Sequence, residues 1–186
     1  MSSIWLAALV VAVVYAIATY NRLVTLRTRT SEGWSDIQVQ MKRRYDLIPN
    51  LVETVKAYAG HEKGTLEAVI EARNAAVADT GSPAHQATTE NVLGGALRQL
   101  FALSESYPDL KANQNFLSLQ KDLGETENLI QGARRYYNGA VKELNIAVEQ
   151  FPSTLVARMT GFDKAEFFEL AESEAAAASQ PVKVSF

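Results

Sequence analysis

The sequence has no cysteine among its 186 residues. This excludes a disulfide framework, thiolate catalysis, cysteine-ligated zinc and a lipid-modified N-terminal cysteine. Only two histidines are present, His61 and His85, and they lie far apart in the chain. His61-Glu62 could begin a zinc-protease motif, but that motif needs a second histidine four residues after the first, where Thr65 stands. We therefore expect no metal ion and no cofactor.

Other short motifs of chemistry are also missing. The chain contains no nucleophile elbow of the form G-x-S-x-G, no P-loop and no dinucleotide-binding fingerprint. Clustered positive charge is scarce as well, because the net charge is −3 and the densest cluster beyond the N-terminal segment is Lys42, Arg43 and Arg44. Binding to a phosphate backbone requires a larger basic surface. We expect neither an enzyme nor a nucleic-acid-binding protein.

An apolar run stands near the N-terminus, from Ile4 to Tyr20, without charge, proline or glycine. As a helix it would be about 25 Å long, which approaches the thickness of the hydrocarbon core of a bilayer. Trp5 and Tyr20 stand where aromatic residues meet the membrane surface. The run therefore predicts one transmembrane helix at residues 4–21, preceded by a short external segment at residues 1–3.

Three arginines follow the run within residues 22–31, and no basic side chain precedes it. The positive-inside rule then places the N-terminus outside and the rest of the chain in the cytoplasm. A cleaved signal peptide is the alternative, because Ala16-Ile17-Ala18 resembles a cleavage site. The missing basic N-terminal region and the unbroken apolar run favour the membrane anchor.

Apolar residues then recur at helical spacing, which predicts an all-α antiparallel bundle over residues 22–172. Pro49 should kink or briefly break the first helix, which is expected to resume at Asn50 and continue to about Ala78. Residues 79–83 predict a loop, and a second helix is expected at about residues 85–105. The apolar positions of the first helix are Trp34, Ile37, Met41, Ile48, Leu51, Val52, Val55 and Tyr58.

A seven-residue apolar repeat is the strongest periodic signal and predicts a long coiled-coil-like helix. Small residues at Ala133, Ala140 and Ala147 favour close antiparallel packing over a self-sufficient zipper. Pro152 should end this helix. A short helix is expected at about residues 163–172, and residues 173–186 predict a flexible tail. The repeat consists of Phe116, Leu123, Ile130, Tyr137, Leu144 and Phe151.

Three charged residues lie on or beside these apolar seams: Arg44, Glu127 and Arg134. We interpret them as a buried or half-buried network that sets the register of the helices. Glu127 and Arg134 are two helical turns apart on one face, which also leaves open a polar ligand pocket. A hydrolytic site on the face of Glu127, Arg134 and Tyr137 is the enzymatic alternative.

Several long segments resemble the LemA family, in the same order and over nearly the whole chain from Tyr20 to about Glu169. They are YNRLV after the apolar run, GWSDIQVQMKRRYDLIPNLVETVKAYAGHE from Gly33 to Glu62, EARNA around Arg73, ESYPDLKANQNFLSLQKDL from Glu105 to Leu123, ARRYYNGAVKELN, FPSTLVA and GFDKAEFFE. The resemblance implies a bacterial cytoplasmic (inner) membrane protein with one span and a cytoplasmic helical bundle. It implies no reaction and no catalytic residue.

The resemblance also implies a class of partner, because family members are often encoded beside a membrane-embedded zinc metalloprotease of the HtpX type. We therefore expect a membrane-anchored adaptor that self-associates and engages a membrane partner in membrane-protein quality control. An envelope structural protein that forms large homo-oligomers and organises the membrane is the alternative. The candidate partner segments are Arg43 to Leu51, with Pro49 and Asn50, and Glu105 to Asn113, with Tyr107, Pro108 and Asp109.

Overall fold

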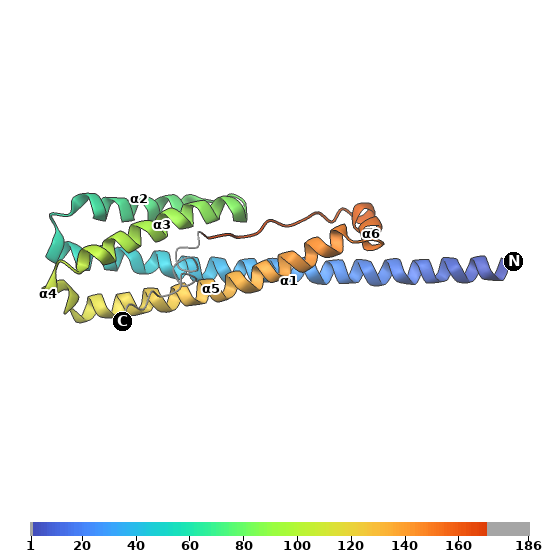
Figure 1. The fold of residues 1–186 in the computed structure, drawn as a ribbon, viewed down its shortest axis with the longest axis horizontal. Coiled ribbons are helices and arrows are strands. Elements are labelled where there is room, and N and C mark those ends of the chain that lie inside the picture. The colour runs from blue at the N-terminus through green and yellow to red at the C-terminus, as the bar shows by residue number, and fades with distance from the viewer. Residues whose placement is uncertain (1, 171–186) are drawn as a thin grey trace, which may run out of the picture.

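The computed structural model describes residues 2–170, and in this part of the chain all regular secondary structure is helical (Figure 1). The predicted all-α antiparallel bundle is confirmed. Its six helices are α1 (Ser2–Ala59), α2 (Lys63–Ala78), α3 (Pro83–Ser104), α4 (Pro108–Lys111), α5 (Gln114–Glu149) and α6 (Ser153–Thr160). The tail predicted at residues 173–186 lies outside the described residues.

Helix α1 joins the apolar run to the bundle without interruption. From Ile4 to Ala18 none of its side chains is buried, whereas Thr19 and Leu23 are the first to be covered by other elements. In Figure 1 this part of α1 projects alone beyond the bundle. Its length and apolar composition make it the one candidate membrane-spanning helix among the described residues.

Helix α5 runs antiparallel to α1 along the bundle (Figure 1). The repeat from Phe116 to Leu144 is buried, as the seven-residue spacing predicts. Phe151 breaks the pattern and is exposed, because α5 ends at Glu149 and the chain turns before Phe151 could reach the seam. The predicted end of the helix before Pro152 is confirmed.

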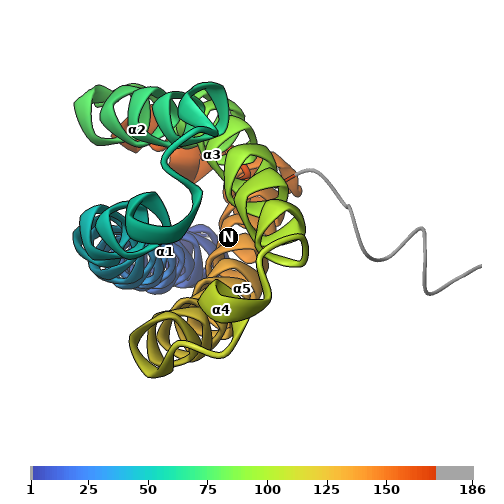
Figure 2. The same cartoon turned by 90° about the vertical axis from the view of Figure 1, so that its left-hand side faces the viewer.

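Helices α2 and α3 form a hairpin over the end of the bundle that is far from the N-terminus (Figure 1). Viewed from this end, α1, α2, α3 and α5 are arranged around a common interior (Figure 2). That interior is a core of large aliphatic side chains, which includes Ile48, Val69, Leu93 and Leu100, closed by Phe116. The predicted helix at 85–105 and loop at 79–83 are confirmed within two residues.

Residues 162–170 form an extended strap where a helix was expected at 163–172. The helix prediction is wrong for the described part of this range. Gly161, with φ of 70°, ends α6 in the left-handed conformation and turns the chain back along the bundle. Phe162 and Phe168 then pack in the groove between α1 and α5, and Ala87 of α3 joins the cluster around Phe168. Burying aromatic rings on both sides of Ala165 favours the extended strap over an amphipathic helix.

A kink or a short break was expected at Pro49; the helix is not interrupted there and ends ten residues later at Ala59. Proline cannot donate the backbone hydrogen bond that the Tyr45 carbonyl would normally receive. The Arg73 side chain of α2 replaces that donor, because its Nε lies 3.0 Å from the Tyr45 carbonyl oxygen. The real turn, Gly60 to Glu62, was missed within the range predicted to be helical up to Ala78.

This compensation predicts a thermodynamic coupling between Arg73 and Pro49. Arg73→Met should lower the free energy of unfolding by about 1–3 kcal/mol, because the Tyr45 carbonyl loses its partner. In a Pro49→Ala background the loss should be clearly smaller, since the backbone amide that the substitution restores can bond to the same carbonyl. Chemical denaturation of the four full-length proteins in detergent micelles measures the difference. Equal losses in both backgrounds would contradict the assigned role of Arg73.

Helices α1 and α5 approach each other closely at Gly33. A Cβ atom added there would lie 3.0 Å from Tyr136 Cδ1 and 3.1 Å from the backbone Cα of Tyr137. Gly33→Ala should therefore destabilise the protein, because overpacking costs about 1–3 kcal/mol and outweighs a gain of up to about 1 kcal/mol in helix propensity. Denaturation of the full-length variant measures this effect.

Gly139→Ala is the matched control, since no heavy atom lies within 4 Å of the Cβ that it would add on α5. It should keep only the gain in helix propensity and stabilise the protein slightly. If both substitutions moved stability in the same direction, the helices would not be in contact at Gly33.

Candidate functional site

The most unusual polar feature of the bundle is a buried arginine on α1. Arg44 stands three residues after Met41 and four before Ile48, so the helical repeat turns it toward the core with them. Its side chain is only 5% exposed. Burial lowers the pKa of Arg44, and the neighbouring Glu127 carboxylate opposes this shift. A buried guanidinium needs negative partners.

Two carboxylates from two other helices supply these partners. Arg44 Nη1 donates to Glu127 Oε2 of α5 over 2.8 Å. Arg44 Nη2 forms an ion pair with Glu90 Oε2 of α3. The Glu90 side chain is 1% exposed, whereas that of Glu127 is 41% exposed and borders solvent. We call Arg44, Glu90 and Glu127 the charge network, and it ties α1, α3 and α5 together.

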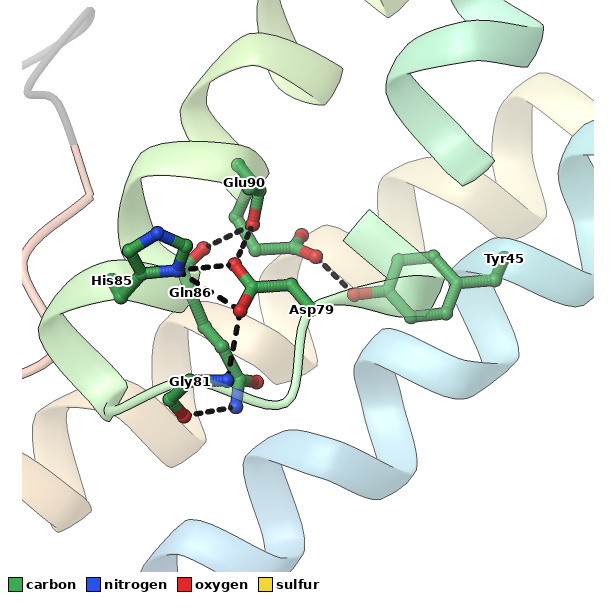
Figure 3. Close-up of polar contacts among 7 residues, drawn as sticks. Tyr45, Asp79, Gly81, His85, Gln86 and Glu90 are labelled. Carbon is green, nitrogen blue, oxygen red and sulfur yellow. Dashed lines mark hydrogen bonds and ion pairs between the residues drawn. The ribbon is translucent and has the colours of Figure 1, made fainter. Parts of the chain in front are cut away.

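Tyr45 extends the charge network on the side of α3. Its hydroxyl donates to Glu90 Oε1, and in Figure 3 these two side chains point toward one another. Burial is the main reason that the pKa of Tyr45 is raised, so the hydroxyl keeps its proton and stays a donor. Both oxygens of Glu90 are therefore engaged, one by a cation and one by a neutral donor.

A second polar cluster closes the turn between α2 and α3 (Figure 3). Asp79 accepts hydrogen bonds from the Gly81 amide over 2.9 Å and from the Thr89 hydroxyl over 2.9 Å, and it lies 2.9 Å from His85 Nδ1. The Gly81 hydrogen bond contributes most to lowering the pKa of Asp79. Gln86 Nε2 bonds back to the Gly81 carbonyl over 2.8 Å. All these bonds fasten the turn, so we assign the cluster a structural role.

Two asparagines of α5 hold the strap. Asn145 donates to the Ala165 carbonyl over 3.0 Å and accepts from the Ala165 amide over 2.8 Å. Asn138 makes the same pair of bonds with Phe168, each of 3.0 Å. Asn138 and Asn145 are two helical turns apart, and Ala165 and Phe168 are three extended residues apart; both separations are about 10 Å. Each asparagine therefore lies opposite one strap residue. Sequence reasoning missed this amide ladder, although its signal is the seven-residue spacing of the asparagines.

The structure brings Arg44 and Glu127 into contact, but not Glu127 and Arg134. Arg134 Nη2 donates to Gln131 Oε1 over 3.2 Å, and Gln131 Nε2 donates to Glu127 Oε1 over 3.4 Å. Arg134 also reaches the Leu170 carbonyl over 3.4 Å, at the end of the described strap. Seven residues of helix rise by about 10 Å, and Gln131 stands between the two side chains.

Glu90 was not singled out from the sequence. It lies three residues after Ala87 and three before Leu93, on the buried side of α3. This spacing in the sequence could have predicted that Glu90 is buried. Tyr137, proposed for a hydrolytic face, instead donates its hydroxyl to the Glu166 carbonyl over 2.7 Å. Burial raises the pKa of Tyr137 to about 12. Glu127 and Arg134 thus share Gln131 as a neighbour, whereas Tyr137 bonds to the strap.

The two candidate partner segments lie at different heights along the bundle. Arg43, Pro49 and Asn50 are exposed on α1. Segment 105–113 forms the tip far from the N-terminus, where Asn113 Nδ2 bonds to Tyr58 Oη over 2.9 Å. Also at this tip, the Tyr107 hydroxyl donates to Glu62 Oε1 over 3.0 Å, and this bond raises the pKa of Tyr107.

Exposed side chains at the tip leave a polar surface. Glu105, Pro108 and Asp109 are exposed, and Lys111 pairs with Glu105. Among residues 2–170, no group of three or more acidic or histidine side chains is arranged to hold a metal ion.

Comparison with known proteins identifies a family and several relatives. The model of the LemA family matches residues 33–186. Magnetosome protein MamQ 2 of Paramagnetospirillum magneticum is 28% identical over 189 residues, covering 86% of this chain and 70% of that protein. Magnetosome protein MamQ of Magnetospirillum gryphiswaldense is 24% identical, covering 90% and 71%. Protein LemA of Metamycoplasma hominis is 26% identical, covering 83% and 70%.

Proposed function

The chain belongs to the LemA family and is a membrane-anchored helical protein, and we propose that it is a non-enzymatic scaffold or adaptor that self-associates and binds another membrane protein. The observation that carries this proposal is the continuity of α1 from Ser2 to Ala59. No loop separates the apolar run from the bundle, so the anchor holds the binding surfaces in a fixed direction. A scaffold benefits from this rigidity, because its binding surfaces are then held at a fixed height and orientation relative to the membrane.

The charge network supports the non-enzymatic part of the proposal. Arg44 is neutralised by Glu90 and Glu127 inside the bundle, and Glu90 is held further by Tyr45. The opposite charges pair with one another and join three helices, which suits a network that sets the register of the helices. The bundle is then a stiff support for its outer surfaces.

Geometry restricts the kind of partner. Residues 22–59 of α1 extend for about 57 Å beyond the apolar run, with Arg43 at roughly 33 Å and the tip at the far end. A protein confined to the hydrocarbon core cannot touch either candidate segment. We propose that the partner has a domain on the same side as the bundle, in the cytoplasm of a bacterial inner membrane, as a metalloprotease of the HtpX type could have.

Single-cysteine variants test this proposal cleanly, because the native chain has no cysteine. Arg43→Cys and Asp109→Cys place a crosslinker on the two candidate segments, and Lys142→Cys and Glu143→Cys are charge-matched controls at exposed positions of α5. Crosslinking in cells, followed by purification in mild detergent, should give one defined hetero-adduct at position 43 or 109. The controls should not give it.

Particle mass in the same preparation measures self-association. Two or more copies with a stoichiometric second protein are the expected result. A large homogeneous assembly with adducts only between copies would contradict the adaptor and favour an envelope structural protein that organises the membrane.

A further inference from the structure

Helix α6 is the element of the bundle nearest to the exposed apolar part of α1. It follows α5 after a turn at residues 150–152 and packs its inner side, centred on Ala157, against Leu23 and Leu26 of α1. In Figure 1, α1 continues alone past α6 toward the N-terminus. The Tyr20 ring stands edge-on to Phe162, with centroids 5.9 Å apart. This end of the bundle is therefore attached directly at the end of the apolar run.

The outer side of this region is apolar and uncovered. Leu155 and Met159 are spaced by four residues, which places them on one side of α6, and Phe151 stands in the turn that precedes this helix. Phe151, Leu155 and Met159 are 74%, 53% and 87% exposed. Single exposed apolar side chains are common, but three large ones on a short helix and its preceding turn indicate a contact surface. We call these three residues the apolar foot.

A crevice shows the depth of the foot relative to the apolar run. It has a volume of about 200 Å³ and is lined on α1 by Tyr15, Thr19, Arg22 and Leu23, and by Phe151 at the turn. These α1 residues stand on both sides of Tyr20 in the sequence. If Tyr20 marks the membrane surface, Phe151 lies at about the height of that surface, where interfacial helices bind.

Positive charge surrounds the foot. Arg22, Arg27 and Arg29 follow the apolar run on α1, and Arg158 stands on α6 between Leu155 and Met159 in sequence. Neither residues 22–31 nor residues 150–162 contain an acidic side chain. Arg27 also covers the Phe162 ring at 4.8 Å. Basic side chains beside an apolar helix face are the pattern that anionic lipid headgroups attract.

We infer that α6 is a membrane-docking foot whose Phe151, Leu155 and Met159 insert into the interface of an anionic bilayer leaflet, with the arginines at headgroup level. The occupant of this apolar face is the lipid surface, because the face adjoins the end of the span and Phe151 lies at the height of the membrane surface. Docking adds a second attachment that fixes the rotation of the bundle about the axis of α1. The inference needs α1 to span the bilayer but does not need the adaptor role.

Depth-dependent fluorescence in vesicles tests this inference. Full-length protein carrying Met159→Cys with an environment-sensitive dye is reconstituted into phosphatidylcholine–phosphatidylglycerol vesicles containing lipids with a nitroxide near the top of the acyl chain. Val92→Cys on α3, also an exposed apolar position, is the matched control, and Val10→Cys reports on the span. We expect lipid quenching at positions 159 and 10, and quenching by aqueous iodide at position 92.

Other outcomes separate the explanations. Iodide quenching at position 159 with lipid quenching at position 10 would overturn the foot while leaving the anchor intact. Protection of position 159 from both quenchers would mean that another copy of the protein covers it, which also overturns the inference. Vesicles of phosphatidylcholine alone should reduce lipid quenching at position 159 several-fold and leave position 10 unchanged. An unchanged signal at position 159 would overturn the preference for anionic lipid.

Discussion

Arg44→Met should lower the free energy of unfolding by about 3–5 kcal/mol, because it leaves the Glu90 carboxylate buried without its cation. The Glu90 side chain is 1% exposed, so water cannot replace the guanidinium without opening the bundle. A loss of this size is a large fraction of the 5–15 kcal/mol by which proteins are usually stable. Chemical denaturation of the full-length protein in micelles, followed by circular dichroism, measures the effect.

Two controls distinguish the buried charge from a general effect of the substitution. Arg43→Met changes the exposed neighbour and should alter stability by no more than about 0.5 kcal/mol. Adding Glu90→Gln to Arg44→Met removes the uncompensated charge and should recover much of the loss. If the double variant were less stable than Arg44→Met alone, an unpaired carboxylate would not be the cause.

Phe168→Ala is the second change with a large expected effect. Phe168 is fully buried between α1 and α5, and its ring centroid lies 5.4 Å from that of Trp34. Deleting a buried phenyl ring costs about 3–5 kcal/mol. Because the ring fixes one end of the strap, we expect the strap to detach from Trp34 before the bundle unfolds.

Trp34 itself reports the result in a Trp5→Phe background, which removes the other tryptophan. Its emission should shift to the red in Phe168→Ala, and amide hydrogens of residues 162–168 should exchange faster than those of α5. Phe167→Ala is the matched control, since the neighbouring ring is exposed and should leave both signals nearly unchanged. Equal changes in the two variants would contradict the assigned burial of Phe168.

Periodicity in the sequence was sufficient to predict the buried faces of the long helices, because each of these helices buries one regular stripe of apolar side chains. The repeat from Phe116 to Leu144 could be assigned to the core for this reason. The pattern failed where the backbone depends on contacts between distant segments. Pro49 stays inside α1 because Arg73, distant in the sequence, donates a hydrogen bond to the Tyr45 carbonyl. Phe168 is buried in an extended strap because its ring packs against apolar side chains of α1 and α5.

The same distinction applies to the charge network. Arg44 and Glu127 could be singled out because a charge on an apolar stripe is visible in one helix alone. Their contact, and the third member Glu90, depend on how α1, α3 and α5 are aligned along one another, which local spacing does not specify. The amide ladder was missed for a related reason. The hydrogen bonds of Asn138 and Asn145 depend on the position of the strap, which the sequence of α5 alone does not predict.

Because α1 is unbroken, the apolar run and the bundle should tilt together about the membrane surface. A span that tilts to match a thinner or thicker bilayer must carry the whole bundle with it. With about 57 Å of helix beyond the apolar run, a change in tilt of about 10° displaces the tip sideways by roughly 10 Å. We therefore expect a change in bilayer thickness to move residues 105–113 sideways by about the width of a helix.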